Sequence, residues 1–230
     1  MALKYENKYE YVSDLGNKKV RFRQWSAKEE RRYLSALENQ KEEFTDKTVY
    51  DILILPCIED KSTVLSSSQQ KKLLIDIRIE SISRYLEDKV ECKECKETII
   101  IKEEINKIMK YIPSKFEPVE VKNLKFFIDE VKSNEDKNKL KISDGIINYV
   151  FNDFILHIKA IEIDGKLTEN IKFKELQEFM DSLPSSIFDE VFDKYKDMVD
   201  DLIMDYECIC PSCGHKEVID YTNIPNLLWA

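Results

Sequence analysis

Two short stretches, Cys92-Lys93-Glu94-Cys95 and Cys210-Pro211-Ser212-Cys213-Gly214-His215, each place two cysteines across a tight turn. Each pair can supply two corners of a zinc tetrahedron, so the two pairs together complete the coordination of one ion. Strand-like sequence follows both turns, as Thr98-Ile-Ile-Ile101 and as Glu217-Val-Ile-Asp220. We therefore expect a zinc-ribbon-like site made from two distant segments, about 88–102 and 205–222.

The expected metal ligands are Cys92, Cys95, Cys210 and Cys213, with Zn²⁺ as a structural ion. Four thiolates leave no coordination position for water, so the metal is not expected to be catalytic. An iron–sulfur site and a redox dithiol are the alternatives. The dithiol is disfavoured because neither pair opens a helix in a thioredoxin-like setting.

The remaining cysteines and His215 are assigned lesser roles. Cys208 stands two residues before Cys210 and is expected to be a bystander on the opposite face of the strand. His215 is an alternative ligand that would replace one thiol. Cys57 follows Pro56 in an apolar helical segment and is expected in the core.

Length and charge limit the classes of protein to which the chain can belong. The chain has 230 residues, 43% of them hydrophobic, which is enough for one or two cores without disulfides. A net charge of -9 repels phosphate backbones and disfavours nonspecific nucleic-acid binding. There is no run of about 18 apolar residues, and the first ten residues include the charged Lys4, Glu6, Lys8 and Glu10, so we expect neither a secreted nor a membrane-spanning protein.

Signatures of common enzymes are missing from the sequence. The chain has two histidines, His157 and His215, and no G-x-S-x-G, P-loop or H-E-x-x-H motif. Acidic pairs such as Asp189-Glu190 and Asp200-Asp201 fall on expected helices and fit solvated faces. His157 fits a hydrogen-bonded core or boundary residue. We therefore expect no enzymatic activity.

Helical periodicity dominates the rest of the chain. Ser26 and Glu29 form a capping box that begins a helix reaching to about Glu42. Asp164-Gly165 between two alternating segments predicts a hairpin. Further helices are expected over about 46–57, 66–88, 103–111, 144–157, 173–179 and 187–204, and strands over about 20–22, 98–101, 119–121, 161–163 and 166–168.

These elements predict an α+β protein that is mainly helical, with the zinc ribbon formed by distant segments. Residues 1–230 are expected to form a single globular unit, with a flexible polar loop at 132–139. The apolar ending Leu227-Leu-Trp-Ala230 is expected to pack either on the protein's own core or on a partner.

The order of several motifs resembles a known family. Val20-Arg-Phe-Arg-Gln-Trp-Ser-Ala-Lys-Glu-Glu-Arg31 is followed by Ile77-Arg-Ile-Glu-Ser81 and by the first cysteine pair, and Leu176-Gln-Glu-Phe179 precedes a proline and the second pair. This order resembles the baseplate hub protein family of T4-type contractile-tailed phages, and the resemblance covers most of the chain.

The resemblance implies a role in building the central hub of a tail baseplate, either as a structural subunit or as a chaperone-like assembly factor absent from the finished particle. The implied partners are other tail and hub proteins, in the host cytoplasm during assembly and in the virion baseplate. The alternative is a zinc-ribbon regulatory protein that binds nucleic acid, for which Lys93, Lys96 and Lys216 are the nearby basic residues.

Overall fold

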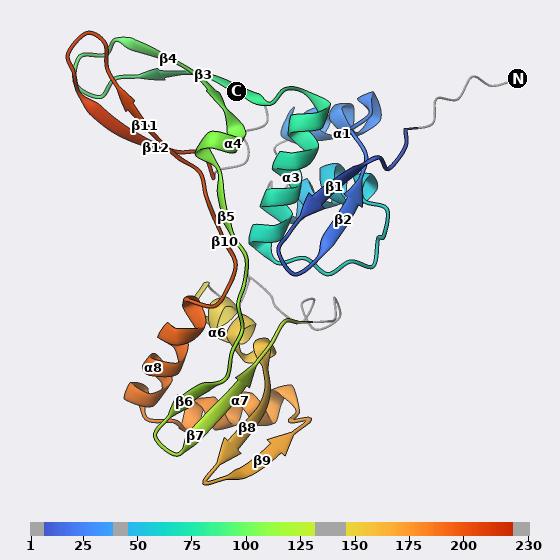
Figure 1. Ribbon diagram of the computed structural model, residues 1–230, viewed down its shortest axis with the longest axis vertical. Coiled ribbons are helices and arrows are strands. Elements are labelled where there is room, and N and C mark those ends of the chain that lie inside the picture. Colours follow the sequence, from blue (N-terminus) through green and yellow to red (C-terminus); the bar gives the residue numbers. More distant parts are fainter. Residues whose placement is uncertain (1–6, 39–45, 132–145, 223–230) are drawn as a thin grey trace, which may run out of the picture. The chain divides into compact units, whose positions relative to one another are not determined.

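The computed structural model describes residues 7–38, 46–131 and 146–222 (Figure 1). These residues divide into two compact units. One unit combines residues up to 113 with those from 200 onward, and the other comprises residues 114–199. The second unit is thus inserted into the first. The expectation that the whole chain forms a single globular unit stays a prediction.

The N-terminal part of the first unit is a hairpin with three helical segments. Pairing of Val12 with Arg21 sets the register of the hairpin, and Gly16 turns it with a φ of 80°. The expected helix from 46 to 57 changes from α to π and then to 3-10 geometry as it reaches Pro56. The elements are β1 (Tyr11–Asp14), β2 (Lys19–Phe22), α1 (Ala27–Glu38), α2 (Asp46–Val49), η1 (Tyr50–Ile54), η2 (Leu55–Cys57) and α3 (Ser67–Ser81).

The N-terminal core explains why these segments are helical where they are. Ser66 and Gln69 complete a capping box at the start of α3, which then buries Leu73, Leu74 and Ile77 against Tyr33 of α1 and its neighbours. Cys57 is fully buried in the same core, as its sequence context predicted.

Beyond α3, the described residues of the first unit form three two-stranded antiparallel sheets and one helical turn. Two of the sheets are hairpins that carry the cysteine turns (Figure 1). The third sheet pairs the strand that leads toward the inserted unit with the strand that returns from it, with Ile112 opposite Asp201. The elements are β3 (Tyr85–Glu91), β4 (Thr98–Glu104), α4 (Ile105–Ile108), β5 (Lys110–Ile112), β10 (Asp201–Ile203), β11 (Asp205–Ile209) and β12 (Lys216–Asp220).

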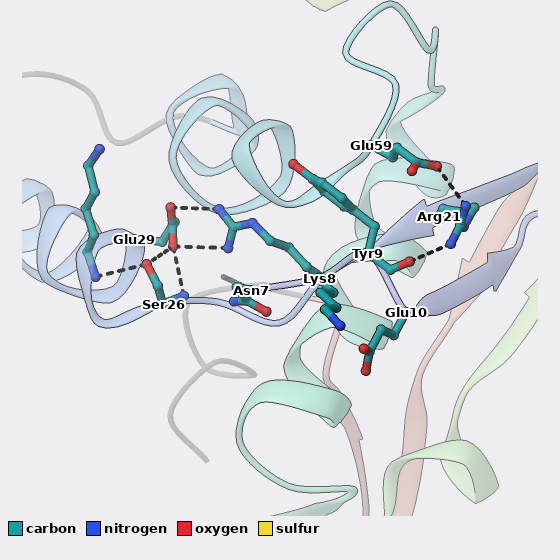
Figure 2. Close-up of a pocket in the computed structure, with 10 residues that line it drawn as sticks. Asn7, Lys8, Tyr9, Glu10, Arg21, Ser26, Glu29 and Glu59 are labelled. Atoms are coloured by element: carbon teal, nitrogen blue, oxygen red, sulfur yellow. Dashed lines mark hydrogen bonds and ion pairs between the residues drawn. The ribbon is translucent and has the colours of Figure 1, made fainter. Parts of the chain in front are cut away.

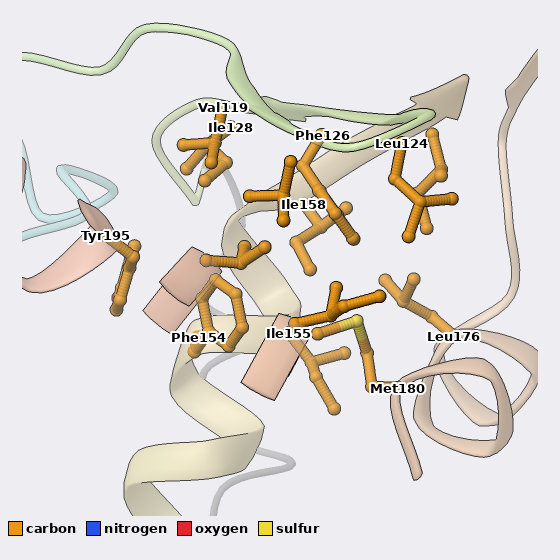
Figure 3. Packing of buried hydrophobic residues seen from close by; sticks show 14 of the residues in the cluster. Val119, Leu124, Phe126, Ile128, Phe154, Ile155, Ile158, Leu176, Met180 and Tyr195 are labelled. Atoms are coloured by element: carbon orange, nitrogen blue, oxygen red, sulfur yellow. The ribbon is translucent and has the colours of Figure 1, made fainter. Parts of the chain in front are cut away.

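In its described residues, 114–131 and 146–199, the second unit is a four-stranded antiparallel sheet in the order β6-β7-β8-β9, together with three helices. Asp164 and Gly165 have positive φ angles of 52° and 79° in the β8–β9 turn, which confirms the predicted hairpin. Figure 3 shows Phe126 and Ile158 from the sheet packed with Phe154 and Met180 from the helices. The elements are β6 (Val119–Val121), β7 (Leu124–Ile128), α6 (Ile146–His157), β8 (Ile158–Ile163), β9 (Lys166–Glu169), α7 (Phe173–Ser182) and α8 (Ser185–Lys196).

The prediction of a mainly helical α+β protein is wrong in its emphasis. The described residues contain twelve strands in five antiparallel sheets beside the helices, so the fold is α+β without a helical majority. Three predicted helices are too long. The helix expected over 103–111 is the single turn α4, which lies between β4 and β5. The helix expected to reach residue 88 ends at Ser81 and gives way to β3, and the one expected to reach residue 204 ends at Lys196, before β10.

The helix predicted to reach residue 88 is too long because of the charge pattern of β3. Leu86 and Val90 face the core of the ribbon, while the alternating charged residues Glu87, Lys89 and Glu91 face solvent. A half-exposed strand can carry such charges, but they have low strand propensity and equally suit a helix surface.

Several expectations fall outside the described residues: the loop at 132–139, the helix cap at Asp144 and the C-terminal Leu227-Leu-Trp-Ala230. None of the described helices has the length and the hydrophobicity needed to cross a membrane.

Candidate metal centre

The two cysteine turns have the same backbone hydrogen bonds. Between β3 and β4, the Cys92 N–H donates to the carbonyl oxygen of Glu97 over 2.9 Å, and the Lys96 N–H donates to that of Cys92 over 3.0 Å. The same two bonds recur between β11 and β12 at 2.8 and 2.9 Å, with Cys210, His215 and Gly214 in the equivalent positions. The turns are therefore equivalent in backbone structure, and each presents two thiols on one side.

The fifth residue of each turn adopts a left-handed conformation. Gly214 has a φ of 74°, as expected for a glycine that can adopt it without steric cost. Lys96 occupies the equivalent position with a φ of 64°. The first turn thus holds a lysine in a conformation that non-glycine residues adopt at some free-energy cost, which the sequence did not reveal.

The four sulfur atoms of the predicted ligands lie together. The Sγ atoms of Cys92, Cys95, Cys210 and Cys213 are all within 4.8 Å of one another. Between the hairpins, Cys92 Sγ lies 3.7 Å from Cys213 Sγ, and Cys95 Sγ lies 3.5 Å from Cys210 Sγ. A tetrahedral zinc ion with Zn–S bonds of about 2.3 Å separates its sulfurs by about 3.8 Å. Four free thiols at this spacing fit a tetrathiolate metal site.

Turn amides favour the thiolate form at one cysteine of each pair. The backbone of Cys213 hydrogen-bonds to the Cys210 thiolate and lowers the pKa of Cys210 to about 7. The backbone of Cys95 likewise lowers the pKa of Cys92. Metal binding requires deprotonated thiols, so each hairpin contributes one sulfur that readily reaches that state.

An apolar core between the hairpins supports the cluster. Tyr221, which follows β12, is 1% exposed and donates its hydroxyl to Asp88 Oδ2 of β3 over 2.9 Å. Burial and this hydrogen bond raise the pKa of Tyr221. The packing therefore joins the two hairpins through contacts beyond the sulfur cluster. The buried residues of this core are Ile75, Leu86, Cys92, Ile99, Ile101, Ile105, Leu202, Met204, Cys208, Cys210 and Tyr221.

The other cysteines and both histidines lie outside the sulfur cluster. Among the residues with described side chains, the potential metal-binding group contains neither Cys208 nor His215. Cys208 is buried in the ribbon core. His157 Nδ1 lies 3.0 Å from the carbonyl oxygen of Asp129 in the second unit, which confirms the expected hydrogen-bonded role.

A pocket of about 690 Å³ lies beside α1 (Figure 2). Its charged walls are largely paired within the protein. Arg23 and Glu29 form an ion pair at 3.1 Å with 13% and 6% of their side chains exposed, and Arg21 pairs with Glu59 at 3.4 Å. Glu29 also accepts from the Ser26 N–H over 2.8 Å, as the predicted capping box requires. The sequence did not reveal the contribution of Arg23. These contacts explain local stability and indicate no chemistry.

Comparisons with known proteins give one match. A family model described as T4 bacteriophage base plate protein matches residues 6–229, which is nearly the whole chain. The comparison with curated proteins and the comparison with solved structures gave no match.

Proposed function

The chain belongs to the T4 bacteriophage base plate protein family, which supports a structural role in the tail baseplate, and we propose that it helps to build the central hub. In this proposal it acts through protein–protein contacts, as a structural subunit or as a chaperone-like assembly factor, and has no catalytic role. The observation that carries the proposal is the family match over residues 6–229. The family points to the virion baseplate as its location; assembly in the host cytoplasm is part of the proposal.

The proposal includes one structural zinc ion bound by Cys92, Cys95, Cys210 and Cys213. The mutual distances of up to 4.8 Å between their sulfurs and the matching backbone of the two turns support it. Zinc would connect a segment that precedes the inserted unit to one that follows it. Its chemistry there is the cross-linking of four thiolates, because no position remains for a substrate.

The outer faces of the ribbon support a role in protein contacts. Ile100 and Val218 are 74% and 60% exposed, more than any other large hydrophobic side chain in the described residues. Ile209 on β11 is 56% exposed and is a diagonal neighbour of Val218 across the β11–β12 ladder. Such side chains are suited to burial against other baseplate proteins, which are the proposed partners.

The alternative of a nucleic-acid-binding zinc ribbon is weakened by the state of its lysines. Binding to phosphates needs a locally positive surface, which acidic neighbours reduce. The three lysines near the cysteine turns are instead paired with Glu217, Glu91 and Glu207; they are Lys93, Lys96 and Lys216.

Complementation of a phage that lacks this chain tests the proposed function. Ile100→Lys and Val218→Lys should each reduce baseplate assembly at least about tenfold, because a buried charge disfavours an apolar interface, while folding is retained. Leu167→Lys is the matched control, since Leu167 is 47% exposed but lies on β9 of the second unit. Wild-type assembly by both ribbon variants would contradict a contact at these faces. Mass spectrometry of purified baseplates separates a subunit, which is present, from an assembly factor, which is absent.

A further inference from the structure

One ion pair joins the two hairpins beside the sulfur cluster. Lys93 lies inside the first cysteine turn, and its Nζ contacts Oε1 of Glu217 on β12, the strand that follows the second turn. Other ion pairs of the described ribbon stay within one hairpin, such as Lys96 with Glu91 and Lys216 with Glu207. Lys93 and Glu217 therefore connect the two halves of the candidate metal centre.

The position of Glu217 is unusual for a strand glutamate. Its side chain is 12% exposed, and it lies opposite the buried Cys208 in the β11–β12 ladder. Its Oε2 atom is buried and has no hydrogen-bond partner in the described part of the chain. A carboxylate in this state is costly, and an apolar side chain would suit the ribbon core better. The contact with Lys93, whose own side chain is 73% exposed, brings a positive charge to the Oε1 side of this carboxylate.

Charge gives Lys93 a second role. Four thiolates around one Zn²⁺ ion carry a net charge of about −2, and the nearby Glu217 carboxylate adds to it. Lys93 follows Cys92 directly in the chain and brings an ammonium group to this region. Removing that group alone would leave a buried carboxylate beside a negatively charged cluster, which strongly disfavours the closed ribbon.

We propose that Lys93 and Glu217 form a latch that aligns the two cysteine turns, so that the four thiols are in place before the metal binds. The proposal rests on the metal centre proposed above. Both are positioning residues, because they act through the cysteines and do not bind the ion. Groups that hydrogen-bond directly to metal ligands typically change metal affinity about 10- to 100-fold, and a contact one step further from the ion should not exceed that range.

A double-mutant cycle with a metal readout tests the latch. The proteins are wild type, Lys93→Met, Glu217→Gln and the double variant, each titrated with Co²⁺ and then with competing Zn²⁺. Visible and charge-transfer bands report a tetrahedral thiolate site. Lys93→Met should weaken Zn²⁺ binding about 30-fold, Glu217→Gln about 5-fold, and the double variant no more than Glu217→Gln, because it no longer contains an unpaired buried carboxylate.

Lys96→Met is the matched control. It also removes a lysine adjacent to a cysteine ligand, but Lys96 pairs with Glu91 inside its own hairpin. The control should weaken Zn²⁺ binding less than about 3-fold, as expected for a general loss of charge near the cluster. Equal losses for Lys93→Met and Lys96→Met, or single losses that simply multiply in the double variant, would overturn the latch.

A metal-free readout separates failure of the latch from failure of the metal centre. If wild-type protein gives no thiolate–Co²⁺ bands, the proposed metal centre is wrong. Urea unfolding of the chelator-treated proteins then decides on the latch. Lys93→Met should lower the unfolding midpoint more than the double variant does, because only Lys93→Met leaves the Glu217 carboxylate unpaired. This penalty should appear without the ion, since the latch aligns the turns before metal binds. A double variant as unstable as Lys93→Met, or less stable, would reject it.

Discussion

Replacing Cys213 by Ser should remove the proposed metal cross-link and lower the free energy of unfolding by about 4 kcal/mol. Cys95 and Cys210 are 115 residues apart, and the loop between them contains the entire inserted unit. Because the unfolded chain holds no preformed site, the binding free energy of the ion adds directly to the free energy of unfolding. Free zinc at about 1,000 times its dissociation constant would contribute about 4 kcal/mol in this way. The β5–β10 pairing and the ribbon core do not include Cys213, so we expect both to remain in the variant and the loss to be limited to the metal-binding term.

The assay is urea unfolding with and without a zinc chelator, together with zinc analysis of protein purified without chelator. Wild type should contain about one zinc per chain and should be destabilised by the chelator. Cys213→Ser should already be unstable and respond little to it. Cys57→Ser and Cys208→Ser are the controls: each loses some core packing but keeps its chelator response. A fully folded wild type without metal, or equal behaviour of all three variants, would refute the ligand assignment.

Three further predictions concern the rest of the first unit. Burial opposes ionisation of Glu29, but hydrogen bonds from Arg23 and Ser26 lower its pKa to about 2. Because this folded-state pKa lies below the usual value, ionised Glu29 should add about 2–3 kcal/mol to the free energy of unfolding above about pH 4.5. This contribution should be lost as the pH falls toward 2 and should be absent in Glu29→Gln, which melting temperatures measured over an acid titration would show. Lys96→Gly should leave zinc content unchanged and stabilise the unit by about 0.5–1 kcal/mol in urea unfolding, because glycine relieves the left-handed φ of 64°. Gly16→Ala should lower the free energy of unfolding by about 2–3 kcal/mol in the same assay, since the new Cβ would lie 2.3 Å from Pro113 Cβ. Gly165→Ala is the control: its new Cβ would meet no atom within 4 Å, so the loss should be about 1 kcal/mol.

The features that the sequence predicted well are those determined by a few neighbouring residues. Asp164-Gly165 specifies a turn that requires two positive φ angles, and the hairpin is present where it was expected. The capping contacts between Ser26 and Glu29 depend on three residues of spacing and are also present. The two C-x-x-C turns belong to the same class, because the chain between the paired cysteines is too short to arrange them in many ways.

Other features that were missed depend on contacts between distant segments, unlike β3, which pairs locally with β4. Asp201 to Ile203 is strand because Lys110 to Ile112 pairs with it, and these segments are separated by the whole inserted unit. No local pattern identifies that partner, and the acidic run before it continues the pattern of a helix surface. The contact of Lys93 with Glu217 is equally non-local, so each residue viewed alone resembled an ordinary surface charge.

These non-local contacts share one structural consequence. The chain leaves the first unit through β5 and returns through β10, and the cysteine turns lie outside that pairing, one before it and one after it. The strand pairing, the ribbon core and the four thiols therefore each close the same long loop, which contains the inserted unit. Because loop closure is most costly for the first contact, each later one forms more readily once another exists. The thiols can thus be brought together by the protein before any metal binds, which is the condition that a latch between Lys93 and Glu217 requires.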